Sequence, residues 1–535
     1  MALSRMEAET AAPAAALPKT GIGTLTLKGV NTYTGTTTVS GGTLAVNGSI
    51  TSSSLTTVGA GAKLKGVGTV GSTTVASGGR LAPGNSIGTL TVAGNLLLHP
   101  GSIYEVEIAA AGQSDRIDVV GGTATVTGAH VDVVRLDPDT SYQDGQTYRI
   151  LNADGGVTGQ FAEVASQSAF LDFDLDHNTD SVDLRISLKT IEPGPGPDPN
   201  PLFGTVAETR NQIATAGGLD ALQQSGPQLA LYNALLMLDA DDCRARAAFD
   251  RLSGRDSTPR ARGVLLDDSR FLRDAVTDRL RAAFDGVGAT TLPVMAYGEN
   301  GPQLAPADTE RLAAWGNAFG SWGNADGDGN AADLKHDTGG LLMGVDGLAF
   351  ETWRLGIVAG YSHTGFDASE RAASGSSDNY HLGAYAGTSW GKLGFRSGLA
   401  YTWHDVETAR SAAFPGFADR LSADYDAGSF QAFGELGYRI DAQAVSFEPF
   451  ASLAYVNLRT AAFSEDGGTA ALHGASQTTD TTFTTLGIRA QADVALGAVP
   501  ATARAMLGWR HAFGDVTPEA GLAFAGGEAL RCLLP

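Results

Sequence analysis

Two short stretches of the sequence match the Gly-x-Ser-x-Gly pattern of serine hydrolases, in which the nucleophilic serine lies on a sharp turn between a strand and a helix. They are Gly84-Asn-Ser-Ile-Gly88 and Gly387-Thr-Ser-Trp-Gly391. The first lies between short strand-like repeats and the second in a predicted hairpin turn, so neither has the required context. We therefore predict no catalytic residue and no enzyme in this chain.

Metal and cofactor chemistry has equally little support. Asp326-Gly-Asp-Gly-Asn330 resembles the start of a calcium loop, but Ala331 follows where that loop needs glycine, and an acidic surface loop explains it better. The nine histidines form no HExxH pair, and no P-loop pattern is present. Two cysteines, Cys243 and Cys532, make neither a disulfide scaffold nor a metal cluster. The sequence predicts no metal site and no cofactor.

Composition limits the protein class. The 535 residues leave room for about three domains. The net charge of -22 argues against a nucleic-acid partner, which needs a basic surface. No run of about 18 apolar residues occurs, so no transmembrane helix is predicted, although a transmembrane barrel would also have a neutral mean hydropathy. Residues 1–20 lack the apolar core of a secretory signal, and we expect the natural start to lie upstream.

The N-terminal part is built from short repeats. Gly23-Thr-Leu-Thr-Leu27 recurs as Gly42-Thr-Leu-Ala-Val46 and Gly88-Thr-Leu-Thr-Val92, at a spacing of roughly twenty residues or about twice that. Each copy alternates like a strand and is bounded by Gly, Asn or Ser. We predict a parallel β-helix over residues 21–104, with a Gly/Thr-rich sandwich as the alternative, and a strand-rich cap over 105–191 that protects its end.

A proline-rich stretch divides the chain. Residues 192–201 read Glu-Pro-Gly-Pro-Gly-Pro-Asp-Pro-Asn-Pro, which cannot pack and favours an extended linker. From 202 to 286 the spacing is helical, as at Phe271, Leu272, Ala275, Val276 and Leu280, and the opposite face is heavily charged. Such a face is usually solvated, but it could also pair with charges inside a polar barrel lumen.

Residues 312–526 alternate over long strands. In 393–404 one face holds Leu393, Phe395, Leu399, Tyr401 and Trp403, whereas the other is small, polar or Arg. Strands of ten residues or more with aromatic residues near their ends favour a transmembrane barrel over a soluble sheet. We predict nine full strands, near Trp315, Met343, Ile357, Leu382, Leu399, Leu436, Leu453, Ile488 and Leu507, and a partial one at 520–525. The fold class is thus all-β with a helical linker: a parallel β-helix, then an incomplete antiparallel transmembrane barrel.

Several motifs resemble one known family. The segment from Gly23 to Gly48 is similar to the passenger-associated repeat of autotransporters, and Leu81-Ala-Pro-Gly-Asn-Ser-Ile-Gly-Thr-Leu90 is similar to its rung ending. Gly375–Gly383, Phe447–Ala451 and Gly508–Gly514 resemble strands of the autotransporter β-domain. The resemblance covers nearly the whole chain after Lys19.

The resemblance implies a mechanism. The barrel would insert into the outer-membrane bilayer with the barrel-assembly machinery and periplasmic chaperones, and the passenger would cross outward as an unfolded hairpin. A helix would remain in the pore, and an autochaperone-like segment, Tyr104–Leu188, would nucleate passenger folding at the cell surface. The pore helix would carry Arg270, Arg273, Asp274 and Arg279, within a lumen lined by Arg354, Arg396, Glu435, Arg439 and Arg489.

Two stretches depart from the family pattern. Autotransporter barrels have about twelve strands and end on a terminal aromatic, whereas this sequence ends Glu528-Ala-Leu-Arg-Cys-Leu-Leu-Pro535. We expect the last strands and the assembly signal to be missing, as after a frameshift. Gly254–Arg262 contains Pro259 where the family continues a helix, and it reads as a short out-of-frame patch.

The predicted function is that of an outer-membrane autotransporter that carries its own β-helical passenger to the cell surface. Three alternatives stay open: an adhesin with an unknown host or cell-surface ligand, an enzyme whose active part lies upstream of Met1, and a truncated product without function.

Overall fold

The computed structural model describes residues 15–136, 139–164, 168–189, 202–254, 258–298, 301–327, 329–368, 371–496, 499–515 and 521–525. It divides into two compact units. The first comprises residues up to Val206 together with Leu222–Ala245, and the second comprises Ala207–Ala221 together with the chain from Arg246 onward. The predicted linker at 192–201 and the tail from 526 lie outside the described residues.

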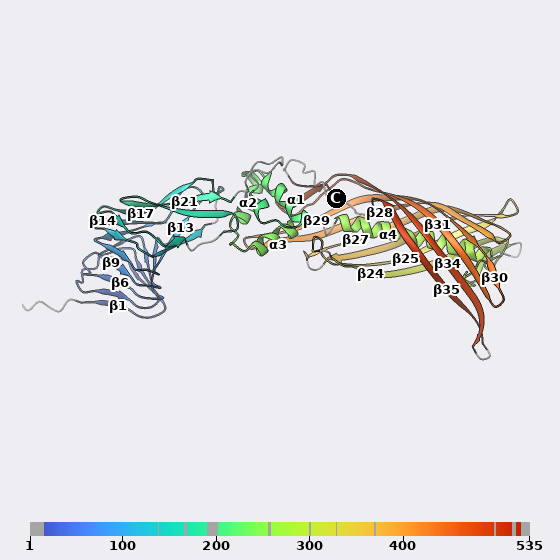
Figure 1. Ribbon diagram of the computed structural model, residues 1–535, viewed down its shortest axis with the longest axis horizontal. Coiled ribbons are helices and arrows are strands. Elements are labelled where there is room, and N and C mark those ends of the chain that lie inside the picture. The colour runs from blue at the N-terminus through green and yellow to red at the C-terminus, as the bar shows by residue number, and fades with distance from the viewer. Residues whose placement is uncertain are drawn as a thin grey trace, which may run out of the picture. The chain divides into compact units, whose positions relative to one another are not determined.

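The first unit is a parallel β-helix with three faces (Figure 1). One sheet contains β1 (Leu17–Lys19), β3 (Thr37–Val39), β6 (Thr56–Val58), β9 (Thr73–Val75), β12 (Leu96–Leu98), β15 (Ala124–Thr125) and β18 (Val157–Thr158). The second contains β2 (Thr24–Leu27), β4 (Thr43–Val46), β7 (Lys63–Gly66), β10 (Arg80–Pro83), β13 (Ile103–Ile108), β16 (His130–Arg135) and β19 (Glu163–Val164). The third contains β5 (Ser49–Ile50), β8 (Thr69–Val70), β11 (Thr89–Ala93), β14 (Arg116–Val120), β17 (Thr147–Ala153), β21 (Ser181–Leu188) and β20 (Leu171–His177).

Stacked side chains supply the core of this unit. On the second sheet Leu44, Leu64, Leu81, Tyr104 and Val131 occupy equivalent positions in successive rungs, and all five are fully buried. A single rung could not bury its apolar face, so each rung is stabilised by its neighbours. The third sheet ends in an antiparallel hairpin, because β17 pairs with β21 and β21 with β20.

The sequence repeats only partly predict the rungs. The copies at 23–27 and 42–46 form β2 and β4, which pair in register on the same sheet. The copy at 88–92 instead contributes to β11 on the third sheet. The same alternation suits a strand on any face of the helix, so the pattern identifies strands without identifying their face.

Short helices follow the β-helix. They are η1 (Phe203–Thr205), α1 (Arg210–Asp220), η2 (Gly226–Gln228), α2 (Leu229–Leu236) and α3 (Asp242–Leu252). In the first unit α2 contacts the capped end of the β-helix: the Phe203 ring packs edge-on against Phe170 and Tyr232. In the second unit α1 begins with a capping box, in which Thr209 and Gln212 satisfy each other's backbone N–H groups.

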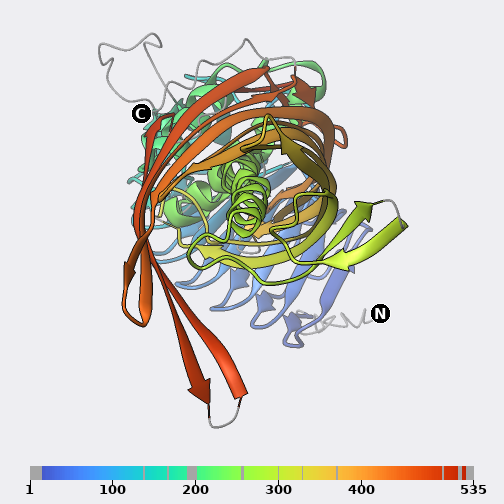
Figure 2. The same ribbon diagram turned by 90° about the vertical axis from the view of Figure 1, so that its right-hand side faces the viewer.

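The second unit is an antiparallel sheet curved around one long helix, α4 (Thr258–Ala283) (Figure 2). The strands run β23 (Gly301–Ala305), β22 (Val294–Gly298), β24 (Leu312–Ala325), β25 (Leu334–Ala349), β26 (Trp353–Ala368), β27 (Ala373–Trp390), β28 (Leu393–Phe414), β29 (Phe417–Tyr438), β31 (Val445–Thr460), β34 (Gln477–Leu496) and β35 (Val499–Gly514), with β30 (Ile440–Ala442) beside β31. Within the described residues, β35 pairs only with β34. No helix among these residues is long and apolar enough to cross a membrane.

All nine predicted full strands are present, as β24–β29, β31, β34 and β35. The predicted partial strand is different. Leu522–Phe524 forms β36, which pairs with β33 (Leu472–Gly474) in a small separate sheet with β32 (Phe463–Ser464). Pro259 does not interrupt a helix, because α3 ends at Leu252 and Pro259 is the second residue of α4, where its missing N–H is not needed.

Candidate functional site: the helix-filled lumen of the sheet

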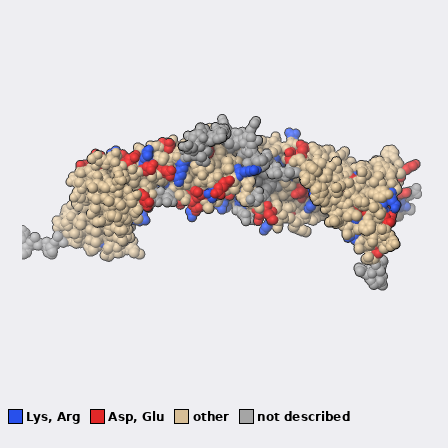
Figure 3. Space-filling view, viewed as in Figure 1, with Lys and Arg blue, Asp and Glu red and all other residues tan. Residues whose placement is uncertain are grey.

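The outer face of the curved sheet is apolar between two aromatic rows. One row lies near the short turns and contains Trp353, Trp390, Phe395 and Tyr438. The other contains Tyr361, Tyr380, Tyr401, Trp403 and Tyr455, all at least 39% exposed. Eight residues separate Phe395 from Trp403, about 27 Å along the strand and about 20 Å at a typical barrel tilt. Figure 3 shows a broad zone here with few charged residues.

The inner face of the sheet surrounds α4. On the helix, Leu265, Leu266, Leu272, Ala275, Val276 and Leu280 are buried in one core with side chains of the sheet. Leu342, Val358, Phe433 and Val456 are among their partners on the strands. Each buried leucine contributes roughly 1.5–3 kcal/mol relative to an exposed one. The helix is therefore packed into the lumen as firmly as a core element.

A buried ion cluster joins α4 to β25 and β26. The Asp346 carboxylate accepts hydrogen bonds from Arg279 Nε and Nη2, both at 2.7 Å, and from Arg354 Nε. The Tyr385 hydroxyl donates to the same carboxylate at 2.8 Å, and Trp315 Nε1 donates to Tyr385 Oη at 2.6 Å. The side chains of Arg279, Asp346 and Arg354 are at most 4% exposed. We call these five residues the Asp346 cluster.

A second cluster stabilises the wall itself. Arg396 Nη1 lies 2.7 Å from Glu435 Oε1 and 2.9 Å from Glu448 Oε1. Arg489 lies 2.7 Å from Glu435 Oε2 and 2.8 Å from Glu448 Oε1, and its guanidinium stacks on Phe450. Two cations and two anions from four strands therefore neutralise one another inside the sheet. Buried charges need such full pairing, because an unpaired one is strongly destabilising.

A polar row crosses the wall beneath the other half of α4. Asp268 of the helix accepts hydrogen bonds from Thr338 and Thr364 at 2.7 and 2.8 Å. Asn379 Nδ2 donates to Thr364 Oγ1, and Asn379 Oδ1 lies 2.6 Å from His404 Nδ1. These contacts give the helix a second polar attachment and satisfy groups that would otherwise be buried without partners.

The end of the lumen near the β28–β29 hairpin is also closed by an ion pair. Arg410 Nε and Nη2 each lie 2.7 Å from an oxygen of Glu465, and both side chains are nearly fully buried. Arg410 Nη1 also donates to the carbonyl of Arg251 at the end of α3. The Leu472 amide donates to Glu465 at 2.9 Å. The segment 461–476 is thereby fixed against the chain that leads into α4.

The predicted helix and lumen charges meet only in part. Of the helix residues, Arg279 forms an ion pair with the wall, whereas Arg270 and Arg273 donate to Ser321 and Gln431. Asp274 lies on the exposed side of α4. Arg354, Arg396, Glu435 and Arg489 are buried inside the sheet as predicted.

The position of Arg439 differs from the prediction. It is 38% exposed, pairs with Asp441 and donates to the Asp285 carbonyl, because it lies just beyond the end of β29. Sequence reasoning missed Asp346, Glu448 and Tyr385. Their signal was present, since all three point to the polar face of alternating strands.

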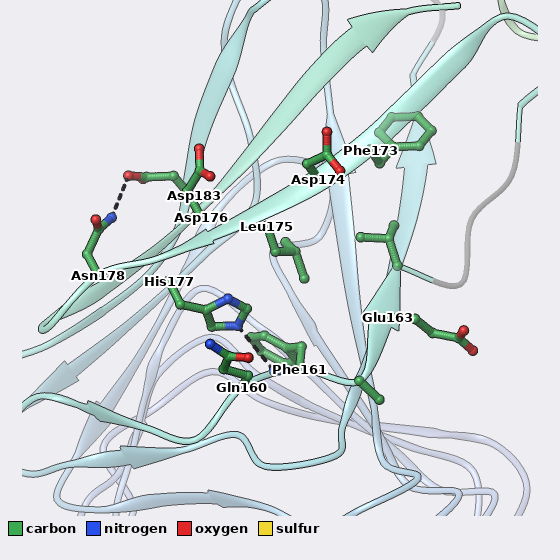
Figure 4. Close-up of a pocket in the computed structure, with 12 residues that line it drawn as sticks. Gln160, Phe161, Glu163, Phe173, Asp174, Leu175, Asp176, His177, Asn178 and Asp183 are labelled. Atoms are coloured by element: carbon green, nitrogen blue, oxygen red, sulfur yellow. Dashed lines mark hydrogen bonds between the residues drawn. The ribbon is translucent and has the colours of Figure 1, made fainter.

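The first unit contains a separate hollow of about 710 Å³ between β19 and β20 (Figure 4). His177 and Phe161 form one wall, where His177 Nε2 accepts the Phe161 N–H at 3.1 Å and burial lowers the pKa of the imidazole. The rim is acidic, with Glu163, Asp174 and Asp176. The lining residues that the structure describes include no Ser, Thr or Cys, and Ser166, two positions after Val164, lies outside the described residues.

The two Gly-x-Ser-x-Gly stretches do not form nucleophile elbows. Ser86 is exposed between β10 and β11, and Ser389 lies in β27, so neither serine precedes a helix. Position 328 of the acidic loop lies outside the described residues, and in the described part of the chain no group of three His, Cys, Asp or Glu side chains could hold a metal ion.

Two family models match parts of the chain. Residues 314–531 match the model of the autotransporter beta-domain, and residues 17–46 match that of the passenger-associated transport repeat. Among solved structures, the chain is similar to the translocator domain of autotransporter NalP from Neisseria meningitidis, at 17% identity and a TM-score of 0.35, over 49% of this chain and 88% of that one. The beta domain of the Bordetella autotransporter BrkA is similar at 20% identity and a TM-score of 0.31, over 37% and 79%.

Curated relatives correct one prediction. Two proteins of Serratia marcescens, each named an extracellular serine protease, are 33% and 31% identical to the chain over 95% of its length. The chain spans about half the length of each relative. The prediction of no enzyme is therefore wrong, because both of these relatives are named as proteases. That prediction was based on motifs within these 535 residues. Such motifs give no information on the part of the relatives that this chain does not span.

Proposed function

The chain belongs to the autotransporters, and from that premise we propose that its curved sheet serves as the outer-membrane translocator of the β-helix that precedes it. The observation that carries the proposal is α4 inside the sheet, fixed by the Asp346 cluster. If a passenger crosses the membrane through its own barrel, the segment that joins the two is expected to remain in the lumen. The helix α4 is such a segment. The two aromatic rows would place the apolar zone in the bilayer.

We propose that the organisation along the chain follows from this role. Residues 21–104 would form passenger rungs, 105–191 an autochaperone-like cap, 192–201 a linker, 202–286 the helical segment with the pore helix, and 312–526 the barrel domain. The barrel-assembly machinery and periplasmic chaperones would be its partners during export. The antiparallel hairpin β20–β21 supports the role of the cap, because it can form locally before any further rung stacks on it.

Membrane fractionation combined with heat-modifiability tests the translocator role. A folded barrel stays compact in detergent gels until it is boiled, so the protein should be found in the outer-membrane fraction and migrate faster unheated than heated. Protein recovered only as soluble or degraded material, with one mobility, would refute the proposal. Deletion of 463–474 is a useful comparison, because it removes the Glu465 contact but leaves residues 461, 462, 475 and 476 for a turn between the paired ends of β31 and β34.

We further propose that the complete passenger carries a serine protease. The support is the name shared by both Serratia relatives and the half of their length that this chain does not span. The experiment is fluorophosphonate labelling of cells that express the natural reading frame with its flanking sequence. A labelled product that is absent for residues 1–535 alone is expected. No labelling of either product, or equal labelling of both, would refute an additional protease portion.

A further inference from the structure

The outer aromatic row is interrupted at one position. Across neighbouring strands, Tyr361 pairs with Tyr380, Tyr380 with Trp403, Trp403 with Gly428, and Gly428 with Arg459. Three aromatic residues in register are therefore followed by a glycine and then by an arginine. Aromatic residues at this level normally continue around a barrel as an interfacial belt.

A hollow of about 540 Å³ lies beside the interruption on the outer face of the sheet. Tyr401 and Trp403, with ring centroids 4.8 Å apart in an edge-on arrangement, form one wall. Gly428 lies beneath the Tyr401 ring, because a Cβ there would lie 2.1 Å from the Tyr401 hydroxyl oxygen, so the missing side chain allows Tyr401 to take its place in this wall. Arg459 lines the opposite side.

The end of the hollow nearer the β28–β29 hairpin is partly polar. Asp426, Ala461, Ala462 and Ser476 line it, and the Ala461 amide donates to the Asp426 carbonyl at 2.9 Å. Asp405 pairs with Asp426 across the strands, so charged residues begin directly above the aromatic row. Below the row the outer face is apolar, with Leu399 and Leu453 each 55% exposed. The hollow therefore lies at the level where lipid headgroups meet acyl chains.

We propose that this hollow binds the headgroup of a phosphorylated glycolipid from the surrounding leaflet. The aromatic wall can stack on the apolar face of a sugar ring, and Asp426 and Ser476 can bond its hydroxyl groups. Arg459 supplies the cation for a phosphate, which guanidinium recognises through paired N–H groups. The volume lies within the range of small-ligand sites and fits a sugar headgroup rather than an acyl chain alone.

The proposal rests on the proposed function, because a lipid reaches this hollow only if the sheet lies in a membrane. Native mass spectrometry of the purified full chain in detergent is the test, with an acylated, bis-phosphorylated glucosamine disaccharide as the probe. We expect one retained glycolipid in the wild type. Arg459→Gln removes the cation and Gly428→Leu displaces Tyr401 from the aromatic wall, and each should weaken retention at least about ten-fold. Arg420→Gln, an exposed arginine on the same strand as Gly428, is the matched control and should bind as the wild type does.

Each alternative outcome overturns the proposal. Equal retention by all four proteins would show that the hollow is not the site. Equal retention of phosphatidylglycerol would remove the requirement for a sugar, and equally tight binding of the unacylated disaccharide would remove the membrane as its source. The two proposals fail differently. If all variants remain heat-modifiable and retain the glycolipid equally, only the proposed glycolipid site is refuted. If the wild type is not heat-modifiable, both the translocator role and the glycolipid site are refuted.

Discussion

Replacing Asp346 by asparagine should release the pore helix while leaving the wall of the barrel intact. Asp346 is fully buried and is the shared anion of Arg279 and Arg354, whose side chains are 4% and 2% exposed. Asparagine keeps the size of the side chain but leaves two guanidinium groups buried without a counter-charge. Breaking a buried ion pair in this way costs about 3–5 kcal/mol. Of the two arginines only Arg279 belongs to the helix, so its withdrawal from the lumen is the available relief.

Hydrogen exchange measures this opening directly, because the exchange rate of an amide reports the free energy of its local unfolding. About 3–5 kcal/mol corresponds to an increase of roughly one hundred- to several-thousand-fold in the exchange of α4 amides near Arg279. Amides of β28 and β29 should be unaffected. Asp424→Asn, an exposed acid on β29, is the control and should change neither set. Unchanged exchange in α4, or an equal increase in α4 and in the wall, would refute the anchoring role of Asp346.

Three further predictions concern other buried groups. Burial raises the pKa of Asp115 to about 7, against about 4 in an unfolded chain. Folding therefore favours its neutral form, and the stability that this form contributes is present below pH 4 and lost as the pH rises through 7. Asp115→Asn should abolish this slope in the exchange of β14 amides. Arg410→Gln leaves Glu465 buried without its cation, so protease cleavage within 461–476 should accelerate by at least about a hundred-fold, and an unchanged rate would exclude the pair as the closure. Tyr104→Phe removes the donor to the buried Ile150 carbonyl and should lower the free energy of unfolding of the β-helix by about 1–3 kcal/mol, as measured by urea denaturation.

The long strands were predictable because their signal is local and repeated. Alternation over ten or more residues in 334–349 or 393–414 identifies a strand and its two faces without any tertiary information. The short hairpin β22–β23 was missed, since its five-residue strands contain Gly298, Gly301 and Pro302 and give no such run. The position of β36 was also not predictable, because its pairing with β33 joins segments about fifty residues apart.

The charged residues of the lumen show the same limit. The polar faces of the strands placed Arg354, Arg396, Glu435 and Arg489 inside the sheet, and all four are buried there. The pairing of Arg279 with Asp346 could not be assigned, because it depends on the rotation and depth of α4 in the lumen. Arg439 follows the same alternation but lies at a strand end, where the distinction between inner and outer faces is lost.

Surface labelling of Cys243 tests the central claim most directly. Cys243 is exposed in α3, and Arg251 at the end of the same helix donates to Ala413 beside the β28–β29 hairpin, so both should lie outside the cell. Lys392 lies in the turn at the opposite end of β28 and should face the periplasm. In a Cys532→Ser background, a membrane-impermeant maleimide should label Cys243 on intact cells. In a Cys243→Ser/Cys532→Ser background, it should label Lys392→Cys only after permeabilisation. Labelling of Lys392→Cys on intact cells, or of Cys243 only after permeabilisation, would contradict export of the β-helix through this barrel.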